Sequence, residues 1–219
     1  METGRARTRC KIRVSVSAVM LAVGFFGSLL TDYGREHASA AVVLVMASGI
    51  HEIGHWVLAR TVGVPLTELR LDLFGARLRT SGTMTYEQEW WLSAGGPLFN
   101  FAGVLILLPL WLSGTGGQTD INPWVLEQVG AFMALSLGLG GLNLLPIETF
   151  DGGRMLYCFL ALFAEEDVAA RIARWVSVIC LTALWMLAVY VLLRVGRSLS
   201  MMVFSGMLLY RGLLGEQGI

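Results

Sequence analysis

The chain has 219 residues, of which 55% are hydrophobic and only 15% are charged, and its formal net charge is zero. Soluble domains carry about 25% charged residues, so this composition, with a mean hydropathy of +0.66, predicts an integral membrane protein with a single membrane domain over residues 1–219. A chain without excess positive charge has no basic surface for a polyanion, so we expect no nucleic-acid partner.

Hydrophobic segments of spanning length recur along the chain. A helix needs about 20 residues to cross the hydrocarbon core of a bilayer, so we expect about six membrane spans. The expected spans are 14–30, 38–59, 90–112, 124–146, 175–193 and 198–214, and a shorter apolar piece occupies 155–163. The motifs described below fall between residues 38 and 163, so the remaining spans flank a motif-bearing core. The predicted fold class is an all-α polytopic membrane protein.

Basic residues are unevenly shared between the two sides of the predicted membrane domain. If six spans alternate from a cytosolic N-terminus, 13 Lys and Arg residues lie on the cytosolic side. Only Arg35, Arg194 and Arg197 lie on the other side. Cytosolic loops of membrane proteins carry such an excess of positive charge, so we expect a multi-pass protein with a cytosolic N-terminus.

The loop between the second and third long spans alternates leucines with charged residues. Leu69, Leu71 and Leu73 recur at every second position, and a period of two predicts a strand. A turn after Leu73 would close a small membrane-associated β-hairpin. The hairpin is either a solvated connector or an edge onto which an extended substrate peptide adds as a strand, bound by the three leucines.

Residues 51–55 read His-Glu-Ile-Gly-His within a predicted span whose only charged residue is Glu52. A carboxylate at membrane depth costs roughly 2.5–3.5 kcal/mol, which disfavours a chance match with two core histidines. Residues i and i+4 share one face of a helix, so His51 and His55 can bind one metal ion. In H-E-x-x-H sites that ion is zinc and the glutamate is the general base, which makes Glu52 the expected catalytic base.

A catalytic zinc site needs a third protein ligand beside an open position. The remaining histidine, His37, is expected on the opposite side of the membrane from the histidine pair. The carboxylates at membrane depth are Glu127, Glu148 and Asp151. We expect Asp151 to be the ligand, because it lies level with the histidine pair and the glycines after it let the backbone approach a metal closely. Glu148 is the alternative.

These motifs resemble the signatures of the site-2 protease family of intramembrane zinc proteases. Residues 96–100 (GPLFN) are similar to its G-P-x-x-N element, and residues 143–152 (NLLPIETFDG) to its N-x-x-P-x(4)-D-G element. With H-E-x-x-H they occur in the family's order over the middle half of the chain. The chain most resembles the compact bacterial sporulation-type branch, which implies a bacterial cell membrane and cleavage near the cytosolic face. Thr149 stands where many members have a second proline.

The resemblance implies a zinc-dependent intramembrane endopeptidase that cleaves a membrane-embedded or membrane-tethered protein within the bilayer. It implies one zinc ion on His51, His55 and Asp151, and a role for Asn143 in binding substrate or the developing oxyanion. The equal alternative for Asn143 is to cap or bond the end of a broken helix, and Asn100 is expected to hydrogen-bond between helices. The alternative functions are a non-catalytic metal-binding membrane protein or membrane chaperone, and an ion transporter. The sequence indicates no oligomeric state.

Overall fold

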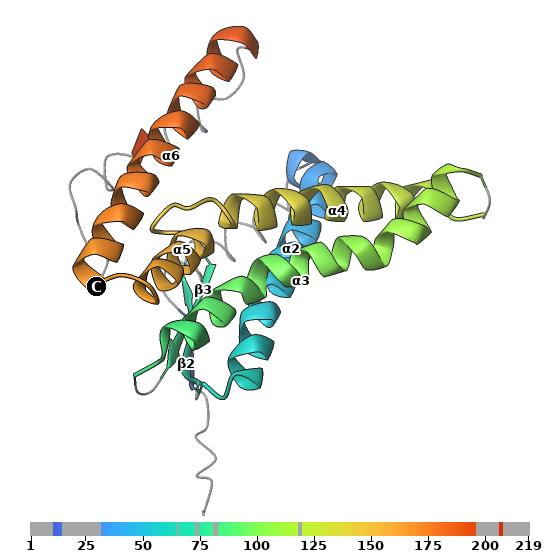
Figure 1. Ribbon diagram of the computed structural model, residues 1–219. Helices are drawn as coiled ribbons and strands as arrows, with labels where there is room; N and C mark the ends of the chain where they lie inside the picture. The colour runs from blue at the N-terminus through green and yellow to red at the C-terminus, as the bar shows by residue number, and fades with distance from the viewer. Residues whose placement is uncertain are drawn as a thin grey trace, which may run out of the picture. The chain divides into compact units, whose positions relative to one another are not determined.

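The computed structural model describes residues 11–14, 32–64, 66–72, 75–80, 83–117, 120–195 and 206–207. The chain forms two compact units, Met1–Gly141 and Leu142–Ile219. The helices and strands, labelled in Figure 1, are β1 (Lys11–Val14), α2 (Asp32–Thr61), β2 (Leu66–Asp72), β3 (Gly75–Thr80), α3 (Tyr86–Thr115), α4 (Pro123–Asn143), α5 (Asp151–Ala161) and α6 (Glu166–Val195).

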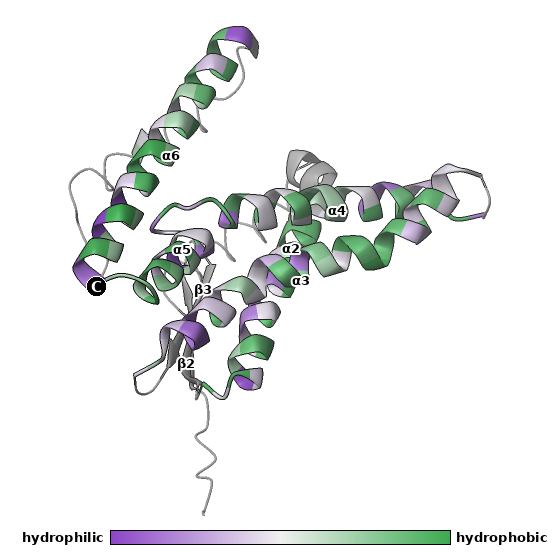
Figure 2. Ribbon diagram, in the orientation of Figure 1, coloured by the Kyte–Doolittle hydropathy of each residue, from purple (hydrophilic) through white to green (hydrophobic). Residues whose placement is uncertain are grey.

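Four of the described helices are long and apolar enough to cross a membrane. They are Ser39–Thr61 within α2, the whole of α3, the whole of α4 and Glu166–Arg194 within α6. Only 11% to 22% of the most apolar stretch of each helix is buried, so most of this hydrophobic surface is exposed. Figure 2 shows the hydrophobic residues along α3, α4 and α6. Such a surface is stable against lipid and costly against water, and the protein is therefore an integral membrane protein.

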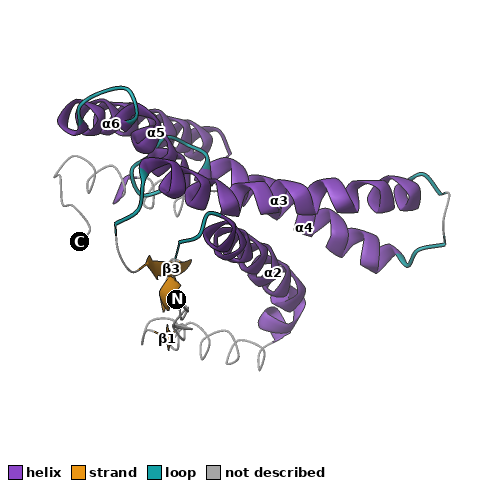
Figure 3. Ribbon diagram, turned by 60° about the horizontal axis from the view of Figure 1, so that its bottom comes forward, coloured by secondary structure: helices purple, strands orange, loops and turns teal. Residues whose placement is uncertain are grey.

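The predicted fold class needs correction. The described residues contain four helices of spanning length instead of about six, and these four cover the predicted spans 38–59, 90–112, 124–146 and 175–193. The predicted spans 14–30 and 198–214 lie almost entirely outside the described residues. The described chain is mainly helical (Figure 3), but it is not all-α with a two-stranded hairpin, because β1, β2 and β3 form one three-stranded sheet.

Strand β2 is the central strand of this sheet. It pairs in parallel with β1, where Lys11 to Val14 oppose Glu68 to Leu71, and antiparallel with β3, where Leu69 opposes Leu78. Both edges of β2 are therefore paired along these residues, and an added peptide strand has no place on them. The alternation of leucines could not predict this, because the partner β1 lies far away in the sequence.

Helices α2 and α3 approach each other most closely at two glycines. A Cβ added to Gly95 would lie 2.6 Å from the carbonyl oxygen of Gly54, and a Cβ added to Gly54 would contact the carbonyl oxygen of Gly95 and lie 2.9 Å from Cβ of Phe99. Only hydrogen fits at either position. Glycine therefore allows α3 to lie directly against the turn of α2 that carries His55.

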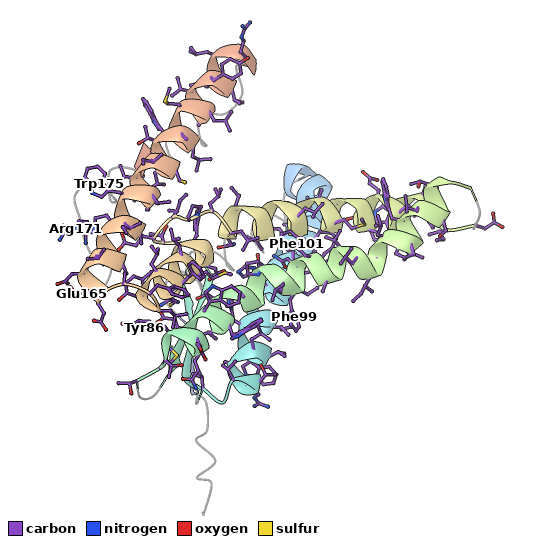
Figure 4. The ribbon with its side chains drawn as sticks, in the orientation of Figure 1. Tyr86, Phe99, Phe101, Glu165, Arg171 and Trp175 are labelled. Atoms are coloured by element: carbon purple, nitrogen blue, oxygen red, sulfur yellow. The ribbon has the colours of Figure 1, made fainter. Side chains whose placement is uncertain are left out.

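Helix α4 completes the helical part of the first unit. The buried residues Val43, Ala47 and Phe132 form a hydrophobic cluster that joins α2 to α4, and Leu107 of α3 packs against it. Phe99 and Phe101 leave α3 on different sides (Figure 4). Phe99 lies beside Gly54 of α2, whereas the ring of Phe101 would lie 3.3 Å from a Cβ on Gly140 of α4.

In the second unit, a turn over residues 144–150 leads from α4 into α5. The glycines at the start of α5 pack on the backbone of this turn: a Cβ on Gly153 would lie 2.7 Å from the amide nitrogen of Glu148. That same amide donates a hydrogen bond of 3.0 Å to Oγ of Ser177 in α6. Ile147 is only 1% exposed, so the turn is anchored by burial and by a hydroxyl of α6.

Candidate metal centre

The histidine pair lies on α2 as the i, i+4 spacing predicts. The two imidazole ring centroids are 4.8 Å apart and the ring planes are nearly perpendicular, at 82°. His51 is 5% exposed and His55 is 9% exposed. Glu52 is half-buried beside His51 on the same turn. Two almost fully buried imidazoles and a carboxylate thus share one turn of a helix of spanning length.

The Nδ1 nitrogens of both histidines face helix α3. Nδ1 of His55 lies 2.7 Å from the carbonyl oxygen of Leu92. A carbonyl oxygen only accepts hydrogen bonds, so Nδ1 of His55 carries the proton and the lone pair is on Nε2. Nδ1 of His51 lies 3.2 Å from the side-chain amide of Asn100. Metal-binding histidines donate the N–H of the ring nitrogen that does not bind the metal to an acceptor, as Nδ1 of His55 does to Leu92.

The Nε2 nitrogens converge on Gly96 of α3. A Cβ added to Gly96 would contact Nε2 of His51 and would lie 2.5 Å from Nε2 of His55. Both Nε2 atoms therefore lie close to Gly96, and a side chain at residue 96 would collide with them. Zinc binds histidine nitrogens at about 2.0–2.1 Å, and two nitrogens that converge in this way can share one ion. These residues therefore fit a bound metal ion.

The other predicted site residues lie in the second unit or in the sheet. Asp151 is the half-buried first residue of α5, and Asn143 is the last residue of α4. Glu148, the alternative ligand, is exposed in the turn before α5. Of the three leucines predicted to bind substrate, Leu69 and Leu71 belong to β2, with side chains outside the described residues, and Leu73 lies outside the described residues altogether.

Two residues of α3 at this centre were not assigned to it from the sequence. Gly96 was noted only as part of a motif, and Asn100 was expected only to hydrogen-bond between helices. Both lie in the motif GPLFN, four residues apart, so they share a face of α3. That spacing was the available signal, but it gives no information about which helix the shared face meets.

No family model matches the chain, but curated proteins that it resembles are named zinc metalloproteases. The chain is 25% identical over 175 residues to zinc metalloprotease MJ0392 of Methanocaldococcus jannaschii, covering 78% of this chain and 50% of that protein. It is 31% identical over 137 residues to the putative zinc metalloprotease Rip3 of Mycobacterium tuberculosis, covering 62% of this chain and 34% of Rip3. The chain thus spans half or less of the length of these relatives.

Among solved structures, the chain is similar to the site-2 protease from Methanocaldococcus jannaschii. The TM-score is 0.60 with 21% sequence identity, and the match covers 95% of this chain and 91% of that chain. The chain therefore has the fold of a site-2 protease, with a histidine pair on one of its helices of spanning length. The predicted resemblance to the site-2 protease family is confirmed, and the assignment to its sporulation-type branch stays a prediction.

Proposed function

We propose that the protein is a zinc-dependent intramembrane endopeptidase that hydrolyses a peptide bond of a membrane-embedded or membrane-tethered protein. The observation that carries this proposal is the convergence of the Nε2 atoms of His51 and His55 on Gly96, on helices of spanning length. It is supported by the two relatives named zinc metalloproteases and by the fold of a site-2 protease.

We infer that Asp151 is the third zinc ligand. Two imidazoles with one carboxylate leave the fourth position that a catalytic zinc needs. Asp151 is half-buried at the start of α5, whereas Glu148 is exposed. The backbone amide of Glu148 is bonded to Ser177, which favours Glu148 as a structural part of the turn.

The reaction needs a proton carrier and a donor to the developing oxyanion. When bound, zinc polarises the scissile carbonyl and makes a water molecule nucleophilic near neutral pH. The carboxylate of Glu52 takes the proton of the attacking water and returns it to the nitrogen of the leaving amine. The side-chain NH₂ of Asn143 donates a hydrogen bond to the carbonyl oxygen as negative charge develops on it.

The position of α2 in the membrane supports cleavage near one face. Arg60, in the last turn of α2, stacks its guanidinium 3.9 Å from the ring centroid of Trp56. Trp and Arg at a helix end mark the membrane–water interface. At 1.5 Å per residue, His55 lies only about 8 Å from Arg60 along the helix. With the positive-inside excess, we propose that this face is cytosolic, as is the N-terminus, in a bacterial cell membrane.

A substrate helix has to unwind before it can be cleaved, because its peptide bonds are held in internal hydrogen bonds within the membrane. An unfolded protein avoids this requirement, so casein is a suitable first probe, followed by a single-span protein. We expect the purified protein to cleave both, and Glu52→Gln to retain zinc and lose cleavage. Undiminished cleavage by Glu52→Gln would exclude the proposed mechanism, in which Glu52 is the general base. If the original chain and Glu52→Gln both bind zinc and neither cleaves a substrate, the non-catalytic metal-binding alternative is favoured.

A further inference from the structure

We propose that Asn100 is a positioning residue for the metal ligand His51. When a metal is bound, the side-chain amide oxygen of Asn100 accepts a hydrogen bond from Nδ1–H of His51. The inference rests on the proposed function, because it presumes that His51 binds a metal through Nε2. It goes beyond that function because it explains what gives His51 the required proton arrangement.

Asn100 and Gly96 approach different nitrogens of the His51 ring. The side-chain amide of Asn100 is 3.2 Å from Nδ1 of His51, and Asn100 is 0% exposed. A Cβ on Gly96 would instead contact Nε2 and lie 2.5 Å from Cε1 of the same ring. One helix, α3, therefore keeps side-chain atoms away from Nε2 of His51 and gives its Nδ1 a polar partner.

The proton on the ring decides whether His51 can bind a metal. A neutral imidazole has one N–H, so a hydrogen bond donated to Nδ1 requires the proton on Nε2. The amide group of Asn100 is placed with Nδ2 toward Nδ1, and its Oδ1 is buried without a hydrogen-bond partner among the described residues. In this arrangement the Nε2 proton occupies the space beside Gly96, and Nε2 has no lone pair for a metal.

Rotation of the amide by 180° reverses this arrangement without changing the shape of the side chain. Oxygen and nitrogen exchange places, as the near-identical outlines of the two orientations allow. The oxygen Oδ1 then accepts from Nδ1–H, and the lone pair is on Nε2, which faces Gly96. The oxygen that has no partner in one orientation is thus the acceptor that metal binding requires in the other.

His55 shows why Asn100 is the residue to test. The Nδ1 partner of His55 is the backbone carbonyl of Leu92, at 2.7 Å, which can only accept and which no substitution removes. The Nδ1 partner of His51 is a side chain that can accept or donate. Loss of such a partner typically lowers metal affinity by about 10- to 100-fold. The effect of substituting Asn100 on the zinc affinity is therefore large enough to measure.

A purely structural role for Asn100 predicts a different result. Its Cβ would lie 3.4 Å from a Cβ on Gly140 of α4, so Asn100 also packs between helices. If packing were its only role, substitutions would change stability and leave the zinc affinity of the folded protein unaltered. If Asn100 positions His51, the zinc affinity depends on whether residue 100 can accept a hydrogen bond.

The experiment compares Asn100→Asp, which keeps an acceptor in nearly the same volume, with Asn100→Leu, which has none. The zinc dissociation constant of the full chain in detergent is measured by competition with a chromophoric chelator. The visible absorption of the Co²⁺-loaded protein reports the ligand geometry. Ser136→Ala is the matched control, because Ser136 is also 0% exposed and lies on α4. Asn100→Ala replaces the leucine variant if the latter does not fold.

We expect Asn100→Leu or Asn100→Ala to weaken zinc binding by about 10- to 100-fold and to change the Co²⁺ spectrum. Asn100→Asp should bind zinc at least as tightly as the original chain, and Ser136→Ala should bind it equally. Equal zinc affinity of the leucine or alanine variant and the original chain would overturn the inference alone. Failure of the original chain to bind zinc would overturn the proposed function and the inference with it.

Discussion

Gly54 of α2 and Gly95 of α3 lie in mutual backbone contact, with no space for a Cβ atom on either. This contact brings the backbone of α3 directly against the turn of α2 that carries His55. The carbonyl of Leu92, the hydrogen on Cα of Gly96 and the amide of Asn100 all reach the histidine pair as a result. The close crossing of α2 and α3 therefore positions the groups of α3 that contact the two histidines.

Substitution of Gly54 tests this crossing. We expect Gly54→Ala to destabilise the protein by about 1–3 kcal/mol, as overpacking does, because the new methyl group meets the backbone of Gly95. Gly49→Ala is the matched control on the same helix, since a Cβ there has nothing within 4 Å. Alanine is a better helix former than glycine by about 0.8–1.0 kcal/mol, so Gly49→Ala should be neutral or stabilising. Thermal unfolding followed by circular dichroism measures both, and equal effects would contradict the prediction.

A methyl group at position 96 should prevent metal binding. Gly96→Ala places its Cβ against both Nε2 atoms, so we expect zinc stoichiometry to fall from one ion per chain to near zero and activity to be lost. Gly103→Ala on the same helix is the control, because its Cβ would lie 3.5 Å from the Phe132 ring, an ordinary contact. Metal analysis of both purified variants measures this. A zinc-loaded Gly96→Ala protein would show that the metal lies elsewhere.

Removal of the metal should lower stability as well as activity. A ligand that binds only the folded state stabilises it, by about 4.1 kcal/mol when its concentration is 1,000 times the dissociation constant. We expect a chelator to lower the unfolding temperature and zinc to restore it. His51→Ala should show neither response, because one of the two buried imidazoles is gone. A chelator effect of the same size in His51→Ala would assign the stabilising metal to a different site.

The turn that presents Asp151 should depend on Ser177 of α6. Ser177→Ala removes the acceptor of the part-buried Glu148 amide, and the loss of one such hydrogen bond costs about 0.5–1.5 kcal/mol. We expect amide hydrogen exchange over residues 144–150 to accelerate by about 2- to 13-fold, and catalytic activity to fall. Thr182→Ala is the control on the same helix, since that hydroxyl bonds the carbonyl of Val178 within α6. Unchanged exchange in Ser177→Ala would show that the turn is held by burial of Ile147 alone.

The sequence by itself determined the properties that depend on composition and local periodicity. A low charged fraction predicted a membrane protein, and four described helices of spanning length bear this out. The i, i+4 spacing placed His51 and His55 on one helix face, because helix geometry repeats every 3.6 residues whatever the surroundings. The order of three motifs predicted the resemblance to site-2 proteases, which the fold confirms.

Only the tertiary structure decided which surfaces meet. The pairing of β1 with β2 and the contact of Asn100 and Gly96 with His51 join residues that are distant in the sequence. Local periodicity gives the face on which a residue lies but not the neighbour of that face. The neighbour is set by how closely two helices can pack, and here that distance is set by the absence of side chains at Gly54 and Gly95.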